Sequence, residues 1–181
     1  MQKSDLRIKM RARKSLLDAD ERRLAGLRVF NTLRSMAAFV MAENVLLYHS
    51  LPDELSTREF LADLPAGKKY YLPRVNGPDL DILPYSASRT HLGAFHIEEP
   101  DGEDLTDIDS IDLIVVPAVA YDRACNRLGR GKGFYDRLLA NSRAIKIGVC
   151  YDFQLVDSID TDEHDVPVDF VIADGLGILR R

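Results

Sequence analysis

The sequence IDLIVVPAV, residues 111–119, is a dense run of branched aliphatic side chains in the second half of the chain. Such a run, without regular polar alternation, is typical of a strand buried on both faces of a parallel sheet. Residues 145–150 form a similar apolar stretch, and a helical segment separates the two. Strands that alternate with helices indicate an α/β protein. We therefore expect a mainly parallel sheet flanked by helices, in three layers and Rossmann-like.

The segments before this run are expected to follow the same plan. Apolar residues at helical spacing predict a helix from about Leu6 to Leu17, and Asp18 or Asp20 is a candidate cap for a second helix that ends near Leu33. The remaining predictions, in chain order, are a strand at 44–49, a helix from a capping box at Ser56 and Glu59 to about Leu64, a strand at 69–72 that Pro73 ends, a turn at 76–78, a strand at 80–83, a polar loop with little regular structure at 86–110, a helix at 134–140, an acidic loop at 152–165 and a last strand at 168–173.

Length and composition place the chain among ordinary globular proteins. It has 181 residues, of which 46% are hydrophobic and 29% charged, so we expect one domain over residues 1–181. The formal net charge of −5 argues against a protein that wraps nucleic acid, and no apolar run approaches a membrane span. Two cysteines are too few for a disulfide scaffold or a zinc site. With no secretory signal, a cytoplasmic protein with reduced thiols is expected.

The most informative stretch for function is RLGRGKGFYD, residues 127–136. It follows a predicted strand and opens a predicted helix, which is where open α/β sheets bind ligands. Glycines at alternate positions let backbone N–H groups approach an anion, and the loop carries an excess of cations. The spacing matches neither a Walker loop nor G-x-G-x-x-G. The loop therefore indicates a phosphate or carboxylate ligand, against the alternative of a solvated surface loop.

The same decapeptide resembles the signature of the 5-formyltetrahydrofolate cyclo-ligase family. Other pieces match in the same order from Lys3 to about Asp169: HSLPDE at 49–54, LPRV at 72–75, EP at 99–100, PAVAYD at 117–122, and HD with VD at 164–169. Two departures occur. Ala124-Cys125-Asn126 stand where the family has a glycine before the signature arginine, and Ala173-Asp174 stand where a threonine often follows the last strand. The predicted fold also resembles the sugar-isomerase and CoA-transferase-like superfamily.

The resemblance implies an enzyme that uses ATP and Mg²⁺ to convert 5-formyltetrahydrofolate to 5,10-methenyltetrahydrofolate. Its catalytic residues would be Arg130 and Lys132, which are suited to clamp phosphoryl oxygens. The implied ATP-binding residues are Lys3, Arg7, Arg127, Leu128, Gly129, Arg130, Gly131, Lys132, Gly133, Phe134 and Tyr135. The implied folate-binding residues are His49, Glu54 and Tyr135, and Asp136 and Asp165 would hold the Mg²⁺.

Other functions stay open on the residues alone. One is an isomerase or transferase that binds a sugar phosphate or a CoA ester, and another is a non-catalytic regulator that binds nucleotide or folate. A third, an RNA-binding protein that uses the basic N-terminal helix, lacks an accompanying RNA-reading motif. We expect small-molecule partners only, with no nucleic acid and no membrane, and a monomer or weak homo-oligomer.

Overall fold

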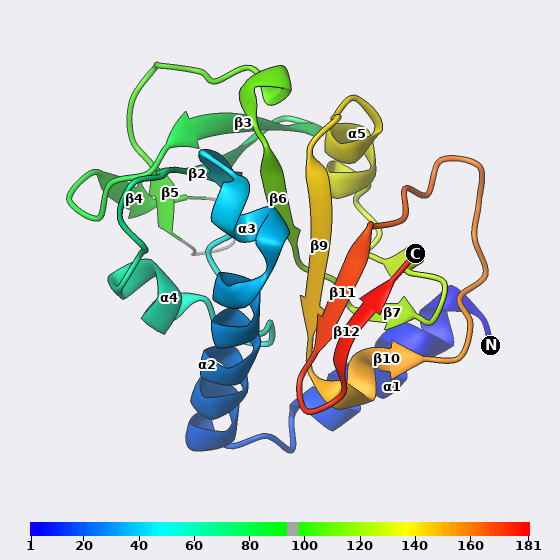
Figure 1. The fold of residues 1–181 in the computed structure, drawn as a ribbon. Helices are drawn as coiled ribbons and strands as arrows, with labels where there is room; N and C mark the ends of the chain where they lie inside the picture. The colour runs from blue at the N-terminus through cyan, green and yellow to red at the C-terminus, as the bar shows by residue number, and fades with distance from the viewer. Residues whose placement is uncertain (94–97) are drawn as a thin grey trace.

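A computed structural model describes residues 1–93 and 98–181 and has an α/β architecture (Figure 1). Within these residues, a seven-stranded sheet lies at the centre. Its strands, in spatial order, are β12 (Gly177–Arg180), β11 (Phe170–Ala173), β9 (Ile145–Cys150), β6 (Leu113–Val116), β1 (Asn44–Leu46), β2 (Lys69–Asn76) and β3 (Asp79–Pro84). The five inner strands pair in parallel, whereas β12 and β3 are antiparallel edges. The predicted α/β class with a mainly parallel sheet is confirmed.

The central strand β6 is buried on both faces, as its composition predicted. Leu113 and Val115 belong to the core on one face of the sheet, and Ile114 and Val116 belong to the core on the other. Three helices cover the first face: α2 (Ala19–Ser35), α3 (Ala37–Met41) and α4 (Arg58–Ala62). The second face is covered by α5 (Phe134–Ala140) and by a small sheet. The strands of this small sheet, in spatial order, are β10 (Leu155–Val156), β7 (Ala120–Asp122) and β8 (Arg127–Leu128).

The N-terminal helix α1 (Lys3–Lys14) packs on the small sheet rather than on the main one. Leu6 and Met10 form a third cluster of buried side chains with Val119, Ala120 and Leu128. Figure 1 shows α1 beside β7 and β10, with the N-terminus at that end of the molecule. This packing brings the basic residues of α1 next to the segment that follows β8.

Several local predictions are confirmed. Helix α2 begins after Asp18, whose side chain accepts a hydrogen bond from Glu21 N while Glu21 returns one to Asp18 N. Helix α5 has the predicted bounds, and Gly77 (φ 57°) lies in the predicted turn between β2 and β3. Cys125, in the turn before the glycine loop, has a left-handed φ of 62°, a conformation that glycine adopts more readily.

Other local predictions are wrong, each for a physical reason. Strand β2 continues through Pro73, because β1 pairs only with residues 69–71 and the strand beyond has a ladder neighbour on one side only. Helix α4 follows Thr57 instead of Ser56 and has five residues, although Ser56 Oγ still accepts from Arg58 N at 3.3 Å. The strand at 168–173 is not the last, because β12 pairs with it as an antiparallel edge.

The segment 86–110 holds more regular structure than expected. Strands β4 (Thr90–Leu92) and β5 (Glu98–Pro100) pair antiparallel, and a 3₁₀ turn, η2 (Ile108–Ser110), precedes β6. Residues 94–97 of this segment lie outside the described residues. A second 3₁₀ turn, η3 (Asp152–Gln154), follows β9 in the acidic loop.

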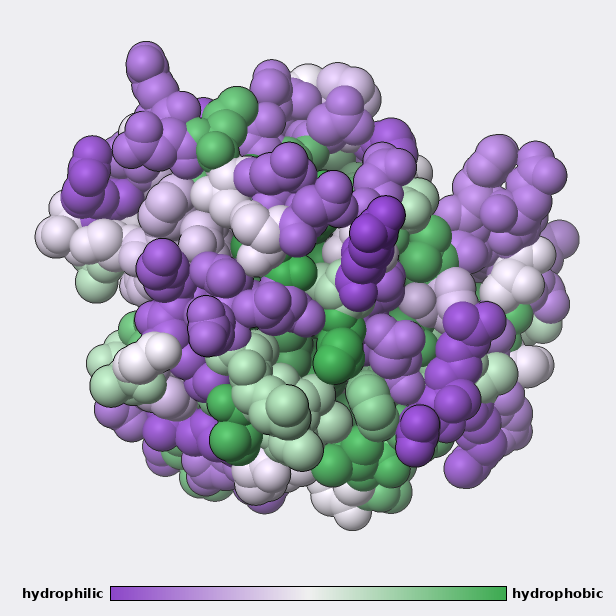
Figure 2. All heavy atoms as spheres, turned by 45° about the horizontal axis from the view of Figure 1, so that its top comes forward, coloured by the Kyte–Doolittle hydropathy of each residue, from purple (hydrophilic) through white to green (hydrophobic). Residues whose placement is uncertain are grey.

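Polar side chains dominate much of the surface. Figure 2 shows hydrophilic residues over most of the upper part of one face, with hydrophobic residues gathered in its lower middle. In the part of the chain that the structure describes, none of the helices combines the length and the apolar character that crossing a bilayer requires. Both cysteines, Cys125 and Cys150, are buried and unpaired with each other.

One close contact holds the small sheet against the main one, and it yields a prediction. The ring of Tyr121 lies so close to Gly148 that an added Cβ would stand 2.5 Å from Tyr121 Cζ, and the ring is fully buried. Gly148→Ala is therefore expected to lower the free energy of unfolding by about 1–3 kcal/mol through overpacking. Urea denaturation measures the change. The double variant Gly148→Ala/Tyr121→Leu should lose less stability than the sum of the losses in the two single variants. A loss equal to that sum would contradict this contact.

Candidate active site

A pocket of about 440 Å³ lies beyond the carboxyl ends of β1 and β6. Tyr48 and His49, which follow β1, form one part of its wall, and Pro117 and Ala118, which follow β6, form another. The glycine loop, residues 129–133, closes the opposite side together with the first turn of α5. Ligands of open α/β sheets bind at this edge, because successive parallel strands present their following loops there.

The glycine loop takes its shape from backbone conformations that favour glycine. Gly131 has a φ of 100° and Gly133 a φ of 70°, both in the left-handed region. Gly133 is the residue before α5, so the chain turns there from the loop into the helix. This turn places Lys132, Phe134 and Tyr135 on the pocket wall together with Arg130.

Arg127, predicted to bind ATP, is paired with a carboxylate of the site. Its NH2 group donates to Asp136 Oδ1 at 2.8 Å, and its side chain is only 4% exposed. The guanidinium lies 5.7 Å from the centre of the Tyr135 ring, at the distance of a cation–π contact. Its Nε has no hydrogen-bond partner within residues 1–93 and 98–181. Arg127 therefore orients Asp136 and Tyr135.

Arg130, predicted to clamp phosphate, is paired with two carboxylates from the segment after β1. Its NH2 group lies 2.5 Å from Asp53 Oδ1, and its Nε lies 3.3 Å from Glu54 Oε1. Glu54 Oε2 accepts from Leu51 N at 2.9 Å. Burial raises the pKa of Glu54, whereas at Asp53 the contacts with Arg130 outweigh burial and lower the pKa. Arg130, a predicted phosphate-binding residue, thus pairs with Glu54, a predicted folate-binding residue, and with Asp53.

His49 also lines the pocket, next to the carboxylate of Glu98 in β5. Its Nε2 is 3.7 Å from Glu98 Oε2, and burial lowers the pKa of His49. Its Nδ1 is buried and finds no hydrogen-bond partner among the residues that the structure describes. Glu99, also in the wall, accepts from Val75 N at 3.2 Å. The pocket wall therefore carries cations from the glycine loop and carboxylates from the segment after β1 and from β5.

Lys3 and Arg7 lie beside the loop without lining the pocket. Arg7 Nε donates to Gly129 O at 2.9 Å, so α1 supports the loop directly. Lys3 Nζ lies 2.5 Å from Asp162 Oδ2 and 2.6 Å from Asp165 Oδ2. These hydrogen bonds raise the pKa of Lys3.

The two predicted metal ligands come from segments that the structure brings together. Val166 N, next to Asp165 in the chain, lies 3.4 Å from Asp136 Oδ1, so the acidic loop reaches the first turn of α5. Among the described residues, the hydrogen bonds to Asp136 arrive at Oδ1 and those to Asp165 at Oδ2. The described residues contain no cluster of three His, Cys, Asp or Glu side chains suited to a metal.

The structure separates the predicted site residues into two groups. Those on the pocket wall are His49, Glu54, Arg127, Gly129, Arg130, Lys132, Gly133, Phe134, Tyr135 and Asp136. Gly131 belongs to the glycine loop itself, Arg7 contacts that loop from α1, and Lys3 pairs with Asp165 of the acidic loop. Leu128 is different, because its side chain is buried with Leu6 and Met10, so any contact with a nucleotide would be through its backbone.

Sequence reasoning missed several residues of the site. These are Asp53, whose carboxylate pairs with Arg130, and Glu98, whose carboxylate lies near His49. Lys14 is a buried lysine close to Asp53. One signal for Lys14 was present: it falls four residues after Met10, on the apolar face of α1 where no charged side chain is expected. No pattern of similar strength marks Glu98, because the segment 86–110 was predicted to be loop.

Fold and site together define a small-molecule enzyme of the α/β class, with a glycine loop suited to phosphate beside a partly apolar pocket. The sequence model of the "5-formyltetrahydrofolate cyclo-ligase family" matches residues 1–174. A 5-formyltetrahydrofolate cyclo-ligase of Escherichia coli K12 is 31% identical over 173 residues, which cover 90% of this chain and 95% of the relative. The chain therefore belongs to the 5-formyltetrahydrofolate cyclo-ligase family.

Solved structures agree with this assignment. The NMR structure of an Aquifex aeolicus 5,10-methenyltetrahydrofolate synthetase is 33% identical, has a TM-score of 0.90 and covers 99% of this chain and 93% of that chain. A Mycoplasma pneumoniae 5,10-methenyltetrahydrofolate synthetase has a TM-score of 0.76 at 23% identity, covers 95% of this chain and 98% of its own, and shows the fold alone.

The contact between Lys3 and the acidic loop gives a pH-dependent prediction. Burial acts to raise the pKa of Asp165, but the hydrogen bonds from Lys3 and Asp162 N outweigh it and hold the pKa below the usual 3.8. The contact therefore stabilises the fold above pH 4 and is lost as the pH falls through the lowered pKa. Lys3→Met should lower the free energy of unfolding by about 1 kcal/mol at pH 7 and leave it unchanged in stronger acid.

Urea denaturation at a series of pH values measures this difference. Lys9, exposed on the same helix, provides the matched control, and Lys9→Met should leave stability unchanged at every pH. A deficit of Lys3→Met that persists below the titration of Asp165 would rule out this contact as its source.

Proposed function

We propose that this chain closes 5-formyltetrahydrofolate to 5,10-methenyltetrahydrofolate, with ATP converted to ADP and phosphate. The chain is a ligase of one-carbon metabolism by its family, and ATP is its cosubstrate. One observation carries the assignment of the site: a single pocket is lined by Arg130 and Lys132, by Glu54 next to Arg130, and by His49. Such a pocket suits a phosphoryl donor and a ring with N–H donors side by side.

The first step is phosphoryl transfer to the formyl oxygen. That oxygen attacks the γ-phosphorus, the bond from phosphorus to the ADP oxygen breaks, and an imidate phosphate forms. Negative charge spreads over the phosphoryl oxygens during transfer, so cations and N–H groups held in place there stabilise the transition state. Lys132 and Arg130 supply the charges, and the glycine-loop backbone supplies N–H donors.

The second step closes the ring. The N10 lone pair attacks the formyl carbon, the bond from carbon to the phosphorylated oxygen breaks, and phosphate leaves while N10 loses its proton. Orientation decides this step, because both nitrogens already belong to one molecule. Glu54 suits the paired N–H donors of the pterin ring, and Tyr135 adds an aromatic face. Both lie on the same wall as Arg130.

We also propose Mg²⁺ as the metal that ATP brings to the site. Asp136 and Asp165 would hold it, since carboxylate oxygens are its preferred ligands and two of them leave room for phosphate oxygens and water. When bound, Mg²⁺ neutralises phosphate charge. The chain's own contribution is to orient the two carboxylates, through Arg127 at Asp136 and through Lys3 at Asp165.

The remaining assignments extend this proposal. The ATP contacts proposed are those predicted from the sequence, with Lys3 and Arg7 adding charge from α1 and Leu128 contributing through its backbone. Residues 1–181 act as one domain, in the cytoplasm, as a monomer or weak homo-oligomer, without nucleic acid or membrane partners. An isomerase or transferase acting on a sugar phosphate or CoA ester is disfavoured by the family match over residues 1–174.

The activity is tested by mixing the purified protein with 5-formyltetrahydrofolate, ATP and Mg²⁺ and following methenyl absorbance. Lys132→Ala should lower kcat about 100-fold, because one charge-stabilising donor is removed. Lys69, exposed at the far end of β2, is the matched control, and Lys69→Ala should keep the wild-type rate. A folded wild-type protein without turnover would point to the non-catalytic regulator instead.

The metal assignment is tested by titrating Mg²⁺ against turnover. Asp136→Asn should raise the Mg²⁺ concentration for half-maximal rate about tenfold or more, since a ligating carboxylate becomes a neutral amide. Asp79 is the control, because it pairs with Arg137 of α5 at 3.1 Å but does not line the pocket. An Asp136→Asn titration that overlays the Asp79→Asn titration would count against Asp136 as a ligand.

A further inference from the structure

Lys14 is a buried lysine at the C-terminal end of α1, and it lies outside the residues assigned so far. It is 2% exposed, and its Nζ lies 4.0 Å from Asp53 Oδ2. Lysine is rarely buried to this extent unless a carboxylate compensates its charge. Burial lowers the pKa of Lys14, whereas Asp53 and Glu54 act to raise it.

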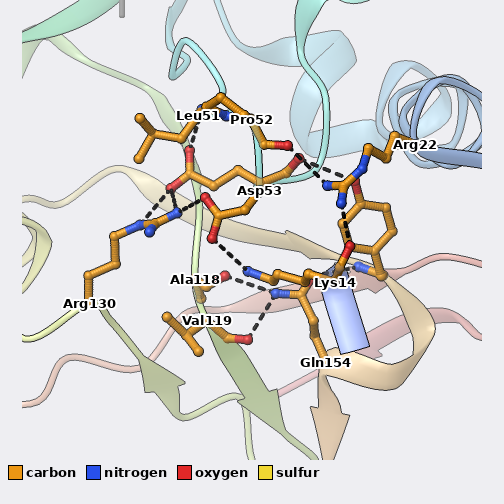
Figure 3. Close-up of polar contacts among 11 residues, drawn as sticks. Lys14, Arg22, Leu51, Pro52, Asp53, Ala118, Val119, Arg130 and Gln154 are labelled. Carbon is orange, nitrogen blue, oxygen red and sulfur yellow. Dashed lines mark hydrogen bonds and ion pairs between the residues drawn. The ribbon is translucent and has the colours of Figure 1, made fainter. Parts of the chain in front are cut away.

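Asp53 stands between Lys14 and Arg130, as Figure 3 shows. Its Oδ2 faces Lys14, while its Oδ1 binds Arg130 NH2 at 2.5 Å. Arg130 in turn lies 3.3 Å from Glu54 Oε1 through both Nε and NH2. Two cations and two carboxylates thus alternate along one line from α1 into the pocket, and their formal charges cancel.

The backbone that carries the two carboxylates is fixed from outside this line (Figure 3). The guanidinium of Arg22 donates to Pro52 O at 3.0 Å and to Lys14 O. Tyr151 donates from its hydroxyl to Glu54 O at 3.2 Å. Asp53 and Lys14 are therefore held by the same arginine, whereas the side chain of Arg130 is 43% exposed and borders the pocket.

Under the proposed function, a phosphoryl group competes with these carboxylates for Arg130. A phosphoryl group draws the guanidinium toward itself, and the pterin ring takes Glu54 as its acceptor. Asp53 then loses its nearest cation while its own position is fixed by the backbone. A partly buried carboxylate without a cation is costly, which would hold Arg130 back. Lys14 is the charge that remains beside Asp53 in that state.

Resting on the proposed function, we propose that Lys14 is a positioning residue: it balances Asp53 so that Arg130 can transfer from Asp53 to the phosphoryl group. Without Lys14, two carboxylates compete for one guanidinium, and Arg130 stays bound to Asp53. The effect on turnover passes through Asp53, so removing the charge of Asp53 should cancel it. A lysine that only supports the packing of α1 would not behave in this way.

Lys14→Met tests the proposal, since Met has a similar length and no charge. We expect kcat to fall about tenfold, part of the roughly 100-fold typical of losing a charge-stabilising group, with the KM for 5-formyltetrahydrofolate changed less than about threefold. Adding Asp53→Asn to Lys14→Met should restore kcat to within about threefold of wild type. Lys9→Met, the same change at an exposed site of α1, should match wild type.

The outcomes separate the alternatives. Wild-type kcat in Lys14→Met, or a loss that Asp53→Asn does not restore, overturns the role of Lys14. Should Lys14→Met fail to fold by circular dichroism, the neutral double variant and Lys14→Arg decide: both should keep kcat within about threefold of wild type, and a larger loss in either overturns the proposal.

Failure of the proposed function is recognised separately, by absent turnover in wild type and Lys9→Met. The same variants are then titrated with ATP alone by calorimetry. Weaker ATP binding in Lys14→Met that Asp53→Asn restores supports the transfer of Arg130 to a phosphate. Equal ATP binding by wild type, Lys9→Met, Lys14→Met and the Lys14→Met/Asp53→Asn double variant overturns it.

Discussion

The arginines of the proposed ATP site are held in place by carboxylates from other parts of the chain. Arg127 binds Asp136, and Arg130 binds Asp53 and Glu54. Each contact orients a guanidinium that would otherwise repel its neighbours in a short loop. The loop's geometry depends on these pairs as much as on its glycines.

Helix α1 contacts the glycine loop, the acidic loop and the segment after β1. Near its N-terminus Arg7 supports the glycine loop and Lys3 holds the acidic loop, and at its C-terminus Lys14 faces Asp53. Its apolar contacts are with the small sheet, so the helix is placed by packing and its cations follow. This placement brings the basic N-terminal segment into contact with both the glycine loop and the acidic loop.

The pocket's polarity follows from which loops the sheet brings together. The segment after β1 and the hairpin of β4 and β5 supply carboxylates, while the segment between β8 and α5 supplies cations. Arg130 forms ion pairs with two of these carboxylates, Asp53 and Glu54. Under the proposed function, the phosphate and N–H groups of the substrates would take the place of these partners.

The sequence by itself determined the α/β class, the central strand β6, the helix α5 and the glycine loop, because burial periodicity and glycine spacing are local properties. Only the tertiary structure decided which carboxylate meets which cation. Arg130 and Asp53 are 77 residues apart and Lys3 and Asp165 are 162 apart, and the chain offers 29 acidic residues as partners for 24 basic ones. The edge strand β12 and the course of β2 through Pro73 were likewise set by neighbours in space, since an edge position removes the hydrogen-bonding demand that local rules assume.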